Sequence, residues 1–498
     1  MKKGTLAAGF FLLFFFSFYS SRVYAVFAFN NNCTEAYKSI ISLRFDEGKK
    51  LLEAEKKENP GNCTPYYLEN YIDFLTLFIG ENEKDFEKLE SNMDERLGRI
   101  EKEDPGSPFF LFTQAEIYLQ WAFARIKFKE YITAAYEINK AYRLLEENTR
   151  RFPAFRANLK SLGLLHAAIG AVPDEYKWIA SITGMQGTIG QGTKELYSLI
   201  QSCGNSEYSY LRDETIFILV FIQFNLQKNE EEAMKLLSYL TPGDQNLLMS
   251  FIRADIAIHA GKNDEAIAIL DSRPEGAAYF PFPYLDFIRG TAKLNRMDKD
   301  ANVPIERFLA GFKGKNYIKS AWQKLAWFQL VNGNEHGYAD CIGRCKTEGN
   351  NFVDEDRQAQ AEAESGIKPN IILLRSRLLT DGGYYNKAIS QFAGSSMKDF
   401  PSLRDKLELP YRLARIYHKK KDFEKAIHYY EQTLKNGASQ SYYFAASSAL
   451  QLGIIYENKK DFPKAREYYM KCLTLKNHEY KNSLDQKAKA GVMRTEGN

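Results

Sequence analysis

Apolar residues recur along this chain with the spacing of helix faces, in stretches separated by short polar turns. From residue 34 onward, no segment shows the alternation of apolar and polar residues that is typical of a strand. The pattern therefore predicts an all-α chain of helical hairpins. It is clearest near the C-terminal end, where residues 411–434 and 450–473 align without a gap.

The two aligned segments share their large and small positions. The matching pairs are Tyr417 with Tyr456, Phe423 with Phe462, Ala426 with Ala465, and Tyr430 with Tyr469. This spacing resembles the tetratricopeptide repeat (TPR), in which small residues lie where two helices cross and aromatic residues fill the gaps between hairpins. The resemblance implies a solenoid of helical hairpins wound into a right-handed superhelix.

Weaker copies of the pattern continue toward the N-terminus. They are marked by Gly383, Tyr385 and Ala388; by Trp322, Leu325 and Ala326; by Gly261 and Ala266; by Ala233; and by Ala36, Phe45, Gly48, Leu52 and Pro60. Most of the chain beyond residue 28 is therefore expected to be built from such hairpins.

One stretch, residues 162–196, departs from the repeat because it is rich in glycine. It resembles a segment of the inclusion-body-clearance family of tetratricopeptide proteins, on the basis of Gly163, Pro173, Gly184, Gly187 and Gly192. Members of that family lack a signal peptide, so the resemblance does not imply a shared intracellular role. We interpret the glycines of GMQGTIGQG (184–192) as turn formers, since neither a dinucleotide loop nor a P-loop has this spacing.

These patterns divide the chain into six parts. They are a signal peptide (1–28), N-terminal helical hairpins (29–150), a Gly-containing helical insert (151–206), degenerate repeats (207–347), a polar loop with one short helix (348–368), and C-terminal repeats with a capping helix (369–498).

The signal peptide is predicted from a basic start at Lys2 and Lys3 followed by a short apolar run. The run is shorter than the roughly 20 residues of a membrane span, and Ala25 and Ala28 are the candidate cleavage points. An uncleaved anchor is the alternative. The protein is therefore expected to be exported, to the periplasm or the medium, with association to the cell envelope as a further option.

The charge of the chain gives no sign of nucleic-acid binding. The full sequence carries a net charge of +4, and removal of the basic residues of the signal peptide brings it close to neutrality. Charges of both signs alternate along the predicted helices, which is typical of a solvated surface.

Export would place the six cysteines in an oxidising compartment. Cys33 opens the first hairpin and Cys63 lies just beyond its end, so we expect a Cys33–Cys63 disulfide. His336, Cys341 and Cys345 share a short segment, but a structural zinc site needs four ligands and no fourth is evident. We predict no metal and no cofactor, and leave open whether Cys341 and Cys345 pair.

The sequence has no recognisable catalytic motif. None of its six histidines stands in His-Glu-x-x-His, and there is no Gly-x-Ser-x-Gly elbow. The acids Asp354, Glu355 and Asp356 are interpreted as solvated loop residues. The chain is therefore predicted not to be an enzyme.

In the tetratricopeptide repeat, positions 2, 5, 9, 12 and 13 of the first helix face the concave surface. The three clear copies place there Asn370, Leu373, Arg377, Thr380 and Asp381; Glu408, Tyr411, Arg415, His418 and Lys419; and Ser447, Leu450, Ile454, Glu457 and Asn458. From these we predict a partner-binding set of Asn370, Arg377, Asp381, Tyr411, Arg415, His418 and Lys419.

Arg377 and Arg415 occupy the same repeat position, so they should be neighbours on adjacent hairpins. Two guanidinium groups beside Tyr411 suit a carboxylate, an acidic peptide or a sugar face. The alternative is that they only form surface salt bridges, with Asp381 and Glu408. The Lys and Asn that bind chaperone tails in related repeats are missing here.

The resulting hypothesis is an exported scaffold that binds a protein or peptide partner, for instance in an envelope assembly. The first alternative is a surface glycan- or nutrient-binding protein, although the lipidated cysteine usual in that class is absent. The second is an all-helical glycosidase, which needs repeats closed into a ring and a pair of carboxylates at its mouth.

Overall fold

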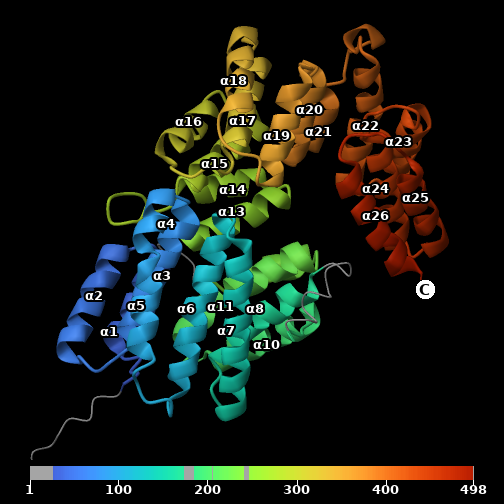
Figure 1. The fold of residues 1–498 in the computed structure, drawn as a ribbon. Helices are drawn as coiled ribbons and strands as arrows, with labels where there is room; N and C mark the ends of the chain where they lie inside the picture. Colours follow the sequence, from blue (N-terminus) through green and yellow to red (C-terminus); the bar gives the residue numbers. More distant parts are fainter. Residues whose placement is uncertain (1–25, 173–183, 205, 241–245, 497–498) are drawn as a thin grey trace, which may run out of the picture.

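The computed structural model describes residues 26–172, 184–204, 206–240 and 246–496. Over these residues the protein consists of helices and turns without a strand, as the hydrophobic pattern predicts. Neighbouring helices pack as antiparallel pairs along the chain (Figure 1).

The N-terminal part contains the longest helices. They are α1 (Asn31–Ile41), α2 (Phe45–Glu58), α3 (Thr64–Gly80), α4 (Glu83–Leu89), α5 (Ser91–Ile100), α6 (Pro108–Lys127), α7 (Tyr131–Arg151), α8 (Asn158–Gly170) and α10 (Ile189–Ser202). The main pairs are α1 with α2, α6 with α7, and α8 with α10.

The middle part continues the hairpins. Its helices are α11 (Arg212–Phe221), which runs into a wide turn at Ile222–Leu226, then α12 (Glu230–Leu237), α13 (Leu247–His259), α14 (Asn263–Asp271), α15 (Tyr284–Arg296), α16 (Asn302–Gly311), α17 (Ile318–Val331) and α18 (Glu335–Thr347).

The C-terminal part begins with a helix where a polar loop with one short helix was expected. It comprises α19 (Asp354–Ser365), α20 (Ile371–Asp381), α21 (Tyr385–Ser390), α22 (Leu403–Lys419), α23 (Phe423–Gly437), α24 (Phe444–Asn458), α25 (Phe462–Thr474) and α26 (Lys481–Thr495). Helix α19 thus spans most of the predicted loop.

The two aligned repeats fold through the same turn. Lys421 and Lys460 adopt left-handed backbone angles, with φ of 62° and 61°, and each precedes an aspartate that caps the next helix. The side chains of Asp422 and Asp461 accept hydrogen bonds from the backbone N–H three residues on, each at 3.3 Å. The same left-handed residue and aspartate cap thus join the two helices in each repeat, in agreement with the alignment of the two segments without a gap.

The glycines of residues 162–196 have two different roles. Gly184 adopts a left-handed φ of +72°, as expected of a turn. Gly192 instead lies inside α10, where a Cβ would come within 2.1 Å of the Gly163 carbonyl oxygen in α8. The turn interpretation is therefore wrong for Gly190 and Gly192, which both lie inside α10, and Gly192 allows α8 and α10 to cross closely. Pro173 lies outside the described residues.

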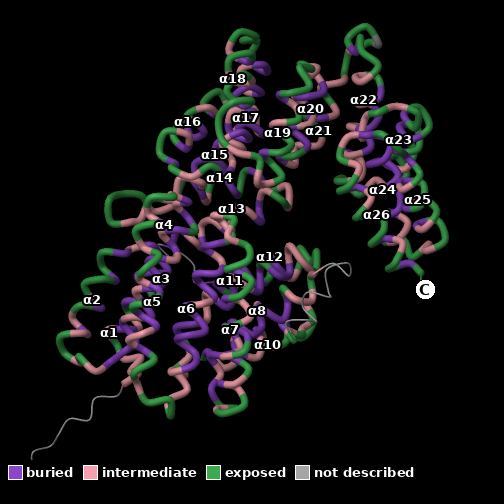
Figure 2. Tube along the Cα trace, in the orientation of Figure 1, coloured by how far each residue is buried: buried purple, intermediate pink, exposed green. Residues whose placement is uncertain are grey.

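Buried residues follow the surfaces where helices face one another (Figure 2). One hydrophobic core extends from α1 to α17. Helices α22 to α26 share a separate core, and they project from the rest of the molecule through α20 and α21 (Figure 1). The two ends of the chain do not meet in Figure 1, so the described helices form no closed ring.

The predicted Cys33–Cys63 disulfide is not formed in this structure, where both are buried free thiols. Cys33 Sγ lies 3.8 Å from the Asn62 amide nitrogen, and the Cys63 thiol donates to Glu103 at 3.6 Å. Burial raises the pKa of both thiols, to about 12 for Cys33 and about 11 for Cys63. The pairing stays a prediction for the oxidised protein.

The predicted signal peptide lies almost wholly outside the described residues. Among the residues that the structure describes, no helix has both the length and the apolar content required to cross a membrane.

Candidate functional site

The first helices of the last hairpins pack against one another in a row, from α17 to α20, α22 and α24. The surface they share carries most of the residues predicted to bind a partner. We call it the inner face, and define it by Lys324, Trp327, Arg377, Tyr411, Arg412, Arg415, His418, Lys419, Tyr443 and Tyr480.

Trp327 is the centre of the inner face on α17. Only 2% of it is exposed, and its indole N–H donates to the Glu362 carboxylate of α19 at 2.7 Å. Two cations lie over its ring, with Lys324 Nζ 3.9 Å and the Arg377 guanidinium carbon 4.5 Å from the ring centre. Burial and the charge of Arg377 lower the pKa of Lys324 to about 8.

On α20, Arg377 also faces Asp381, at 3.9 Å. The salt-bridge alternative is thus realised here, though only as a long contact on the surface. Asn370 has a different role from the one predicted, because it caps α20. Its side chain accepts hydrogen bonds from the backbone of Ile372 and Leu373 and donates to the Asp399 carbonyl.

A row of three tyrosines runs from α22 toward α26. Tyr411 is buried, and its hydroxyl lies 3.0 Å from Ser447 Oγ. Its ring meets that of Tyr443 at 5.6 Å, and Tyr443 meets Tyr480 at 5.4 Å, both edge to face. Tyr480 is 42% exposed, so the row leads from the core to solvent.

Glu408 does not neutralise Arg415, as the salt-bridge alternative proposed. Its carboxylate pairs with Arg412, whose Nε donates at 2.8 Å, and lies 3.9 Å from Arg404. Among the residues that the structure describes, Arg415 forms no ion pair, and the tyrosines Tyr411 and Tyr430 lie near its guanidinium group.

His418 shares this positive environment. Its Nδ1 lies 3.3 Å from the Tyr430 hydroxyl. Burial, with the charges of Arg415 and Lys419, lowers the pKa of His418 to about 4, so the ring is neutral near pH 7. Lys419 is exposed at the rim. The part of the inner face on α22 therefore presents Arg415 and Lys419 as uncompensated cations beside aromatic rings.

Part of the inner face lies in a segment that matches a known family. Residues 405–478, which cover α22 to α25, match the family model of the tetratricopeptide repeat. The protein contains tetratricopeptide repeats in this C-terminal segment. No curated protein matches its sequence. The resemblance of residues 162–196 to the inclusion-body-clearance family lies outside that match and stays a prediction.

Several inner-face residues are missing from the predicted set. With Leu325 and Ala326 in phase, the repeat count places Trp327 at the position of Arg377 and Arg415. The sequence alone was therefore sufficient to predict Trp327 on this face. Arg412, Tyr443 and Tyr480 lie at other positions of the repeat. Arg412 lies on α22 itself, whereas Tyr443 and Tyr480, which precede α24 and α26, extend the row of rings that begins at Tyr411.

The residues considered as metal ligands do not converge. The His336 side chain is 90% exposed and lies 3.5 Å from Asp340, whereas Cys345 is buried and donates to the Lys319 carbonyl. Within the described ranges, no group of three or more His, Cys, Asp or Glu side chains is placed to hold a metal ion.

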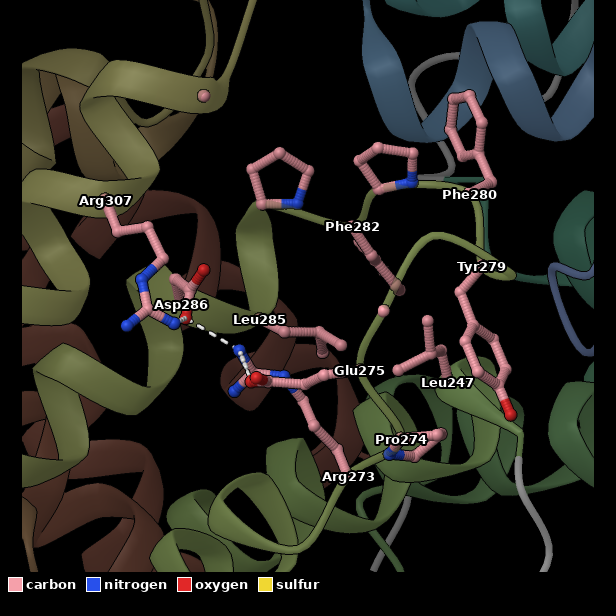
Figure 3. A pocket seen from close by; sticks show the side chains of 14 residues that line it. Leu247, Arg273, Pro274, Glu275, Tyr279, Phe280, Phe282, Leu285, Asp286 and Arg307 are labelled. Atoms are coloured by element: carbon pink, nitrogen blue, oxygen red, sulfur yellow. Dashed lines mark hydrogen bonds and ion pairs between the residues drawn. The ribbon is translucent and has the colours of Figure 1, made fainter.

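Apart from the inner face, the structure has a hollow between the loop 272–283 and helices α13, α15 and α16 (Figure 3). Its volume is about 280 Å³, and Leu247, Phe282 and Leu285 form part of its wall. Arg273 is already paired, at 2.7 Å with Asp286 and at 3.0 Å with Glu275. The hollow therefore offers apolar contact and a neutralised cation, in contrast to the inner face.

Proposed function

We propose that this protein is an exported, non-catalytic scaffold that binds a segment of a protein partner along the inner face. The observation that carries the proposal is the uncompensated guanidinium of Arg415 beside the tyrosine row. Tetratricopeptide repeats commonly serve as protein-binding scaffolds, and residues 405–478 match the model of that repeat.

The chemistry of the inner face suits a peptide with carboxylates. A guanidinium group offers a planar pair of donors that matches a carboxylate, and a desolvated site strengthens that contact. Arg377 lies at the same repeat position one hairpin earlier, so a segment that crosses both hairpins meets two such groups. Tyr443 and Tyr480 add partly exposed rings for apolar side chains.

Export is supported by the basic start and short apolar run at residues 1–28. We propose the periplasm or the medium as the location, with an envelope assembly as the setting. The cysteine usage agrees with that compartment but also with a reducing one, because the thiols are buried and free in the structure.

Crosslinking mass spectrometry on the tagged protein in its own cells tests this function. We expect crosslinks from a defined partner to map to α20, α22 and α24, and to fall at least tenfold in the Arg377→Glu/Arg415→Glu variant. The matched control reverses two exposed lysines on the second helices, Lys435→Glu/Lys471→Glu, and should keep the crosslinks.

A thermal melt of each variant shows whether it remains folded. Loss of crosslinks in both variants would point to a different surface. Absence of crosslinks in the unchanged protein would remove the main support for a protein partner, and glycan-array binding would then test the alternative of a glycan-binding protein.

A further inference from the structure

Helix α19 does not belong to the alternation of hairpins. Helix α17 pairs with α18, and α20 pairs with α21, whereas α19 lies between these pairs in sequence. In space α20 packs directly on α15 and α17. Leu374 and Leu378 of α20 share a core with Ala326 and Trp327 of α17. The stack thus continues past α19, which is an added helix.

Helix α19 lies on the inner face of α17. Its Glu362 accepts hydrogen bonds from Trp327 Nε1 at 2.7 Å and from Gln323 Nε2 at 2.8 Å. These donors occupy positions 9 and 5 of their repeat, which face the partner in tetratricopeptide repeats. Asp356 holds the other end of α19, because it accepts from the backbone N–H of Tyr317 and Ser320 at 2.6 and 2.9 Å.

The apolar contact that holds α19 is small. Among its residues only Asp356, Ala359 and Ala363 are buried, and the two alanines pack on Cys345 with Trp322 and Ile342 beside them. The opposite side of the helix is exposed. Helix α19 is also acidic, with five carboxylates against one arginine. Helix α19 is therefore held in place mainly by hydrogen bonds to its acidic side chains and by the packing of two alanine methyl groups.

We propose that the surface of Gln323, Lys324, Trp327 and Arg377 is a binding site for an acidic helix of a partner protein, and that α19 occupies it until the partner binds. This inference rests on the proposed function and names the class of partner. Helix α19 shows which residues fit this site. They are a glutamate that accepts a hydrogen bond from the indole N–H, as Glu362 does, and small residues next to it and three positions earlier, as Ala363 and Ala359 are.

Charge complementarity favours this occupant over a basic or apolar one. Lys324 and Arg377 both lie over the Trp327 ring, and Glu362 is the carboxylate hydrogen-bonded to its indole N–H. A partner helix with the same glutamate and additional acids would reproduce the contacts of α19. It could also reach Arg415 on α22, which α19 leaves without a carboxylate.

A synthetic peptide of residues 350–368, fluorescently labelled, is the probe. The test variant is the full chain with Ala359→Glu/Ala363→Glu, which removes α19 from the site and leaves Trp327, Lys324 and Arg377 unchanged. We expect the peptide to bind this variant at least tenfold more tightly than it binds the unchanged chain. The same peptide with Glu362→Lys should bind the variant at least tenfold more weakly.

The matched control is Gln358→Glu/Ala361→Glu, which adds the same charge to the exposed side of α19. It should bind the peptide as weakly as the unchanged chain does. Hydrogen exchange should become fast at residues 354–365 of the test variant only, while α17 and α22–α26 keep their protection.

Equal binding of the peptide to all chains, or binding to none, would overturn the proposal. Cooperative loss of the α17–α18 hairpin in the test variant would also overturn it, because α19 would then be part of the core. If that variant does not fold, Glu362→Gln applies the same test, with faster exchange in α19 and tighter peptide binding expected. Crosslinking at Arg415 reports separately on the proposed function.

Discussion

The most consequential single residue in the N-terminal part is Lys160, which is almost fully buried in α8. Its Nζ donates to Glu116 Oε2 at 2.7 Å, to Tyr71 Oη at 2.6 Å and to Glu214 at 3.1 Å. Although burial disfavours a charged amine, the carboxylates of Glu116 and Glu214 keep the pKa of Lys160 above its usual value. One ammonium group on α8 thus joins α3, α6 and α11.

We predict that Lys160→Met lowers the free energy of unfolding by about 3–5 kcal/mol, because it leaves Glu116 buried without its cation. Urea denaturation followed by circular dichroism measures the loss. Lys38→Met is the control, since Lys38 pairs with Glu35 on the surface and should cost about 1 kcal/mol or less. A small, equal loss in both variants would show that the buried network is not stabilising.

His418 gives the C-terminal repeats a pH dependence. Its pKa is about 4 in the folded protein, against the ordinary 6.5, so the unfolded chain binds the extra proton between these values. Stability should therefore fall as the pH is lowered from 6.5 toward 4, by at most about 1.4 kcal/mol per pH unit from this group. Thermal melts should show the unchanged chain losing stability relative to His418→Gln, which does not titrate, as the pH falls from 6.5 to 4. Parallel curves would contradict the assignment.

At the scale of elements, the hairpins with strong periodicity could be predicted from sequence, because Tyr430, Ala426 and their equivalents are buried for the same packing reason. Helix α19 could not be predicted as a full helix, since only Ala359 and Ala363 supply apolar contact and no hydrophobic stripe results. Gly192 was misinterpreted because a glycine at a helix crossing and a glycine in a turn look alike in sequence.

The candidate site, too, could be predicted only in part from the sequence. The repeat count predicted that Arg377 and Arg415 lie on neighbouring first helices. It could not predict that Glu408 pairs with Arg412, nor that Asn370 is used as a helix cap, because those choices depend on side-chain geometry across helices.

The crossing of α8 and α10 provides a test at this scale. We predict that Gly192→Ala destabilises the protein by about 1–3 kcal/mol, because the new Cβ would lie 2.1 Å from the Gly163 carbonyl and 2.7 Å from the Ala167 nitrogen. Gly190→Ala in the same helix is the control. A Cβ there meets nothing within 4 Å, so helix propensity should keep or raise stability. Melting temperatures test this prediction. Gly192→Ala should melt at a lower temperature than Gly190→Ala, and equal values would contradict the prediction.

The contacts between segments distant in sequence are distributed unevenly between the N-terminal part of the molecule and helices α22–α26. In the N-terminal body, segments far apart in sequence touch. The Phe280 N–H donates to the Leu43 carbonyl at 2.7 Å, the Phe280 ring stacks on Phe45 at 4.9 Å, and Asn316 donates to Glu81 at 2.6 Å. Helices α22–α26 have no such return contact in the hydrophobic clusters of the described residues, and join the body through Leu379, Ala388 and Ile416.

Two cores with a small junction should unfold in two steps. We predict that Leu452→Ala, at a fully buried position of α24, lowers only the transition of α22–α26, by about 2–5 kcal/mol. Leu145→Ala, equally buried in α7, should lower only the other transition. Calorimetry resolves the steps, and hydrogen exchange assigns them to segments. A single transition that both substitutions shift alike would mean that the inner face is one rigid surface, and that a partner meets α17 and α24 in a fixed relation.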